Sequence, residues 1–86
     1  MNYTEMLQSE IAYYTKKGYI PQLKISQMSI REMEKIVDYC FTLEHNISFE
    51  EFSNNTSLGY YTTEKEIKKI IEKRKMGCNT KWDQQH

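Results

Sequence analysis

Three Ser/Thr-x-x-Glu motifs constrain the fold of this 86-residue chain more than any other feature. Each motif opens a segment with regularly spaced apolar residues, and the three are Ser29–Glu32, Ser48–Glu51 and Thr63–Glu66. In such a capping box, the hydroxyl accepts a hydrogen bond from the backbone N–H three residues later. The glutamate accepts one from the backbone N–H of the capping residue. The motifs therefore predict three helix starts.

Apolar spacing extends this prediction along the chain. Near the N-terminus, side chains at intervals of three and four predict a helix over residues 4–17 with one inward face, made of Tyr3, Leu7, Ile11 and Tyr14. Gly18 follows two lysines and is a suitable C-terminal cap. The segment after Ser29 carries the broadest apolar stripe, which predicts a central helix with Ile30, Met33, Ile36, Val37, Cys40 and Phe41 directed inward.

We therefore predict an all-α fold. It is a small single-domain bundle of three main helices, over residues 4–17, 29–44 and 63–75, plus one short helix over residues 48–54. Residues 1–77 are expected to form the compact domain, and residues 78–86 a polar, loosely ordered tail. Between the first two helices, Pro21 favours an extended backbone. We expect an extended crossing there, because a lone strand has nothing to pair with.

Charge and hydropathy limit the classes of function. Twelve basic side chains balance twelve acidic ones, which argues against a protein whose main work is to neutralise duplex phosphates. Residues 1–61 carry five basic and eight acidic side chains, net −3, and residues 62–86 carry seven and four, net +3. The chain shows neither a membrane-spanning run nor a signal-peptide pattern, so we expect a cytoplasmic protein with free thiols at Cys40 and Cys78.

Residues with catalytic or metal-binding chemistry form no recognisable pattern. Two cysteines and two histidines are present, but Cys40, His45, Cys78 and His86 lack the close pairs of ligands that are typical of zinc sites. Neither histidine has a neighbouring nucleophile or acid arranged for a triad, and a glycine-rich phosphate loop is absent from the sequence. We predict a protein that is not an enzyme, with no cofactor, no metal and no small-molecule substrate.

The leading hypothesis is a small regulatory or accessory protein that docks on a protein partner, with a homodimer left open. The high content of Lys, Ile, Asn and Tyr is what an A+T-rich gene would encode, and small domains of this kind are common on phages and plasmids. Several aromatic residues lie off the main stripes or in loops, and exposed aromatic side chains are common interface anchors. The candidates are Tyr13, Tyr39, Tyr60, Tyr61 and Trp82.

The alternative hypothesis is a DNA-binding regulator of helix-turn-helix type. Residues 48–54 and 63–75 would be its two helices, and the second helix carries Lys65, Lys68, Lys69, Lys73, Arg74 and Lys75. The intervening loop of roughly eight residues is longer than the usual turn of about 3–4 residues. Glu64 and Glu66 also lie in the first turn of the supposed recognition helix, where they would face phosphates.

Overall fold

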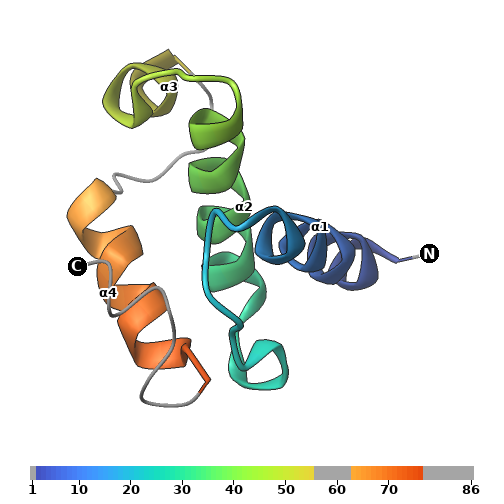
Figure 1. Ribbon diagram of the computed structural model, residues 1–86. Coiled ribbons are helices and arrows are strands. Elements are labelled where there is room, and N and C mark those ends of the chain that lie inside the picture. The colour runs from blue at the N-terminus through green and yellow to red at the C-terminus, as the bar shows by residue number, and fades with distance from the viewer. Residues whose placement is uncertain (1, 56–62, 77–86) are drawn as a thin grey trace.

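The computed structural model describes residues 2–55 and 63–76, which form an all-α fold. The elements follow in the order α1 (Tyr3–Lys17), a 3₁₀ helix (Ile25–Gln27), α2 (Ile30–Glu44), α3 (Phe49–Asn55) and α4 (Glu64–Arg74). Helix α2 lies between α1 and α4, and α3 packs near its C-terminal end (Figure 1). The predicted small helical bundle is confirmed, and each predicted helix boundary lies within one residue of the observed one.

Helix α1 is capped at both ends by its own sequence. The side chain of Asn2 accepts a hydrogen bond from the Glu5 N–H at 2.8 Å, in a capping box that a search for Ser and Thr alone overlooks. At the other end, Gly18 has a φ of 91°. The Tyr19 N–H then donates to the Tyr14 carbonyl at 3.1 Å, and the two rings meet edge to face. This is a Schellman motif with its usual apolar contact, so the predicted role of Gly18 is confirmed.

The predicted hydroxyl caps of the other three helices are also present. The Ser29 hydroxyl accepts from the Glu32 N–H, and the Glu32 carboxylate accepts from the Ser29 N–H, both at 3.1 Å. Ser48 and Thr63 accept hydrogen bonds from the N–H groups three residues later, at 3.5 and 3.2 Å. Helix α2 ends in a second Schellman motif around Asn46, which adopts a positive φ of 56° that asparagine tolerates better than most residues.

Helix α1 crosses α2 at a steep angle (Figure 1). Two tyrosines tie the helices together: the Tyr3 hydroxyl donates to the Glu34 carboxylate, and the Tyr13 hydroxyl donates to Glu44 at 2.7 Å. Residues 18–29 connect the two helices and carry the buried side chains of Ile20 and Leu23 into the core.

This connection does have a partner, which corrects the expectation that it lies unpaired. The Lys24 N–H donates to the Arg74 carbonyl at 2.7 Å, and the Met76 N–H donates to the Gln22 carbonyl at 2.8 Å. Leu23 and Lys75 thus form an isolated antiparallel bridge. The partner is the segment that follows α4, about fifty positions later in the chain. The sequence alone does not reveal that these two segments are neighbours.

All the helices and the connection contribute to one core, formed by Leu7, Ile11, Tyr14, Ile20, Leu23, Met28, Met33, Ile36, Tyr39, Cys40, Phe49, Ile67 and Ile71. Most of the predicted inward residues belong to it. The predictions for Tyr3, Ile30 and Phe41 are wrong, because these side chains are 49%, 46% and 37% exposed. Because α3 and α4 pack against α2, the buried side of α2 includes Tyr39 and Thr42. Ile30 and Phe41 lie outside this buried side.

Within the described residues, none of the helices combines the length and the apolar character needed to cross a lipid bilayer. The predicted tail over residues 78–86 lies outside the described part of the chain.

Candidate functional site

Helix α4 presents two chemically different faces. The Thr63 hydroxyl fixes its start, and Ile67 and Ile71 are buried on the side that packs against α2. Helix α4 runs opposite to α2, because Glu64 in its first turn lies near Tyr39 while Arg74 in its last turn contacts Glu32. Most of its remaining positions are exposed and charged.

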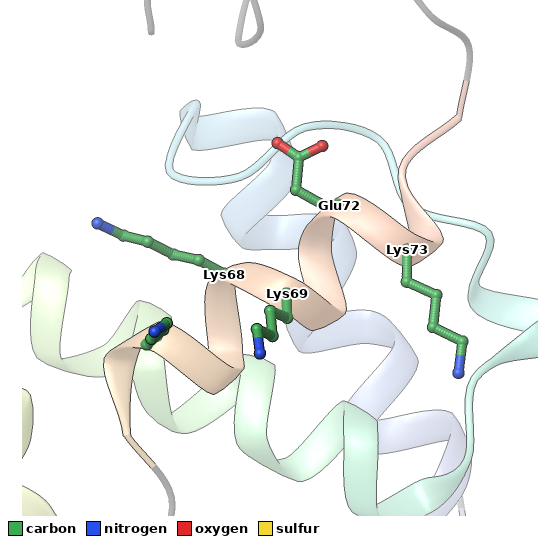
Figure 2. Close-up of a pocket in the computed structure, with 5 residues that line it drawn as sticks. Lys68, Lys69, Glu72 and Lys73 are labelled. Atoms are coloured by element: carbon green, nitrogen blue, oxygen red, sulfur yellow. The ribbon is translucent and has the colours of Figure 1, made fainter.

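A shallow, open depression runs along the solvent side of α4, lined by Lys65, Lys68, Lys69, Glu72 and Lys73 (Figure 2). Lys65, Lys69 and Lys73 recur at every fourth residue, which places them in one row along the helix. We call these three residues the lysine face. Figure 2 shows the ammonium groups of Lys69 and Lys73 on the side of α4 opposite the Glu72 carboxylate.

The ion pairs of α4 do not include the lysine face. Lys68 pairs with Glu64 at 3.8 Å, and Glu72 pairs with Lys75 at 2.9 Å. In the described part of the chain, Lys65, Lys69 and Lys73 make no ion pair or side-chain hydrogen bond, although the charge of Lys73 is near enough to Glu32 to help lower the pKa of that carboxyl group. Three adjacent positive charges repel one another, so an anionic group bound against them relieves an unfavourable interaction.

Two of the predicted DNA-binding residues are not part of this surface. Arg74 turns towards α2, where its guanidinium lies 3.2 Å from the Glu32 carboxylate with both side chains 19% exposed. Lys75 lies past the end of α4, pairs with Glu72 and has a side chain only 16% exposed. Both side chains are therefore mostly buried and engaged in ion pairs, rather than exposed on α4 as the DNA-binding alternative expects. Lys65, Lys68, Lys69 and Lys73 are exposed as predicted.

Burial of Glu32 raises the pKa of its carboxyl group, but other contacts outweigh this effect. The Ser29 N–H and the Arg74 guanidinium both donate to the carboxylate, so the net pKa lies below the ordinary value. The carboxylate stays ionised and holds the only arginine of α4 away from the lysine face.

Of the tyrosines predicted as interface anchors, Tyr39 is buried, at 8% exposure, and its prediction as an exposed anchor is wrong. Its ring packs edge to face on Phe49, and burial and the nearby Glu64 raise its pKa to about 12. Tyr13 is 46% exposed, but its hydroxyl is bound to Glu44 and the Lys17 ammonium lies 5.7 Å from its ring centre. Tyr60, Tyr61 and Trp82 lie outside the described residues.

Several exposed apolar side chains, which sequence reasoning missed, lie near the end of α2. Phe41, Leu43 and Ile47 are each about 40% exposed. The Phe41 ring contacts His45 at a centroid distance of 4.3 Å and Phe52 at 5.5 Å. The helical spacing of Phe41 suggested an inward position, and the contact with Phe52 of α3 replaces the expected contact with the core.

Cys40 is a potential nucleophile that lies in the core. It is fully buried, and desolvation raises its pKa to about 12, so the thiol is protonated and inaccessible. Among the described residues, no three His, Cys, Asp or Glu side chains gather as metal ligands would. Cys78 and His86 lie outside those residues.

No protein-family model, curated protein or solved structure matches this chain.

Proposed function

We propose that this protein is a small, non-enzymatic regulatory or accessory protein that docks on a protein partner through α4. The single observation that supports the proposal is the lysine face, three exposed lysines at four-residue spacing with no ion pair among the described residues. Charge left uncompensated on a well-packed helix is a common means of steering a partner of opposite charge. The surrounding fold is a rigid support, because Ile67 and Ile71 anchor the opposite side of α4 in the core.

Three features favour a protein over a nucleic acid as the partner. Glu64, Glu66 and Glu72 are interspersed with the lysines, so a continuous phosphate backbone would lie near these carboxylates, whereas a protein can place its acidic side chains opposite the lysines alone. Arg74, the one α4 residue suited to bidentate phosphate binding, is bound to Glu32. The whole chain is also neutral, whereas nucleic-acid-binding domains usually have a strong basic excess.

The DNA-binding alternative uses the same lysines and makes different predictions. Duplex binding that depends on phosphate contacts falls steeply with added salt, whereas a protein interface with apolar contacts loses less affinity. Reversal of Lys68, Lys69 and Lys73 to Glu would abolish duplex binding under this alternative. An absence of duplex binding at low salt would exclude it.

An affinity capture experiment separates the two partner classes. The full chain is immobilised and exposed to lysate of the cells that express it, with and without nuclease. A matched pair of variants accompanies the wild type. K65Q/K69Q/K73Q neutralises the lysine face. K16Q/K17Q/K24Q removes three other exposed lysines, so the two variants have the same net charge.

The proposal predicts a protein that is captured equally with and without nuclease, is lost with K65Q/K69Q/K73Q and is retained by K16Q/K17Q/K24Q. Capture that nuclease abolishes would favour the DNA-binding alternative. Capture that both variants retain would show that the partner uses a surface other than α4.

A further inference from the structure

The spacing of the lysine face restricts the shape of what it binds. Four residues of α-helix rise about 6 Å, so Lys65, Lys69 and Lys73 repeat a positive charge every ~6 Å over ~12 Å. A second α-helix with an acidic residue at every fourth position repeats its charges at the same interval when it lies alongside. Same-face side chains of an extended strand repeat at about 6.6 Å, so a strand drifts out of register by about 1 Å over the same length.

The depression between the lysines supplies the second requirement, an apolar contact. Its walls are mainly the aliphatic stems of Lys65, Lys68, Lys69 and Lys73, while the ammonium groups reach towards solvent (Figure 2). Lysine stems offer apolar surface while the charged ends remain hydrated. A ligand that matches both features carries small apolar side chains between its carboxylates, as an amphipathic acidic helix does.

We propose that the lysine face binds an acidic helical segment of a partner protein, with Asp or Glu at every fourth residue. The proposal rests on the function proposed above and specifies the chemistry of the partner at that same site. The carboxylates of the segment pair with Lys65, Lys69 and Lys73. Its small apolar residues cover the lysine stems, and Glu72, which also lines the depression, repels a segment that is shifted towards it.

Fluorescence anisotropy with synthetic peptides tests this proposal. The probe is a labelled alanine-based peptide of about 18 residues, long enough to form a helix, with three Glu at intervals of four. Its control has Gln at the same three positions. A DNA duplex of about 20 base pairs and the two lysine-to-glutamine variants complete the set, with K65R/K69R/K73R as the variant that keeps the charge. Circular dichroism verifies that each variant is folded.

The Glu peptide is expected to bind the wild type, K65R/K69R/K73R and K16Q/K17Q/K24Q with similar affinity. It should bind K65Q/K69Q/K73Q roughly tenfold more weakly or worse, and the Gln peptide should bind the wild type with a similar loss. Equal weakening in both glutamine variants would show that only bulk charge matters and would overturn the proposal. Tighter binding of the duplex than of the Glu peptide, or no peptide binding at low salt, would overturn it as well.

Two further results distinguish a failure of this inference from a failure of the proposed function. If the captured protein depends on the lysine face but the Glu peptide does not bind, the docking function stands and the acidic helix is the wrong ligand. If sedimentation shows a salt-sensitive dimer that K65Q/K69Q/K73Q abolishes, a second copy of the chain occupies the face, and the proposed acidic segment is overturned.

Discussion

Disruption of the ion pair between Glu32 and Arg74 is expected to lower the free energy of unfolding by about 1 kcal/mol. The two side chains are mostly buried and separated by 42 positions in sequence, and they join α2 to the last turn of α4. The perturbations are Glu32→Gln, which removes the charge but keeps an acceptor for the Ser29 N–H, and Arg74→Met, which keeps the aliphatic stem. The double variant completes a thermodynamic cycle.

The magnitude follows from the geometry. Opposite unit charges at the observed 3.2 Å attract by about 5 kcal/mol at an effective dielectric constant of about 20. The cost of desolvation and of ordering two long side chains offsets most of this attraction. The remainder is expected near the upper end of the range for exposed pairs, about 1 kcal/mol. In a domain of this size that corresponds to a decrease in Tm of roughly 4–8 °C.

The dependence on pH gives a second readout. Because the folded pKa of Glu32 is lowered, the coupling is fully present above the unfolded pKa of a glutamate. It is lost as the pH falls through the folded pKa. The coupling energy is measured by urea unfolding, followed by circular dichroism, at a pH above the unfolded pKa and at a pH below the folded pKa. A coupling energy below about 0.3 kcal/mol at neutral pH would refute the reasoning. Arg74 would then be free to join the lysine face and would strengthen the case for phosphate binding.

Other predictions concern the caps, the core and the tyrosines. Gly18→Ala should lower the free energy of unfolding in urea by about 1 kcal/mol, because a φ of 91° strains an L-residue even though the added Cβ meets no atom within 4 Å. Gly18→Asn should lower it less, and an equal decrease for both variants would contradict this explanation. In a Cys78→Ser background, Cys40 should resist alkylation until urea unfolds the chain, because its thiol is buried with a pKa of about 12. Mass spectrometry measures the labelling, and rapid labelling of the folded protein would mean that the core opens readily. If Tyr60 and Tyr61 anchor the partner, as the sequence-based hypothesis expects, their replacement by Ala should abolish partner capture without unfolding the chain, whereas unchanged capture would remove these tyrosines from the interface and leave docking to the lysine face.

Local signals in the sequence were sufficient to locate the helices. Ser29, Ser48, Thr63 and Gly18 act within a few residues of themselves, so their roles can be read from the chain without knowledge of the tertiary structure. Asn2 could have been found by the same reasoning if asparagine had been counted among the N-caps. Boundaries within one residue are the result.

The errors arise where distant segments meet. Tyr39 lies off the apolar stripe of α2, and only the arrival of Phe49 and Glu64 from α3 and α4 makes it a core residue. The pairing of residues 22–24 with residues 74–76 likewise depends on how α4 packs. Helical periodicity describes one face of one helix, and a central helix with neighbours on several sides buries more than that face.

The candidate site could be predicted in part. The basic character of the last helix is visible in the sequence, and the row formed by Lys65, Lys69 and Lys73 follows from their spacing. The sequence could not show that Arg74 is bound elsewhere, because Glu32 is distant in sequence. Lys75 pairs locally with Glu72, but its position depends on the backbone bridge to Leu23, which is also distant in sequence.

Lysine footprinting of the captured complex tests the central claim most directly. The free protein and its complex are treated briefly with an amine-acetylating reagent, and the modification of each lysine is measured by mass spectrometry. Docking through α4 predicts that Lys65, Lys69 and Lys73 become protected in the complex while Lys16, Lys17 and Lys24 react as before. Unchanged reactivity of the lysine face, together with protection elsewhere, would show that α4 is not the docking surface.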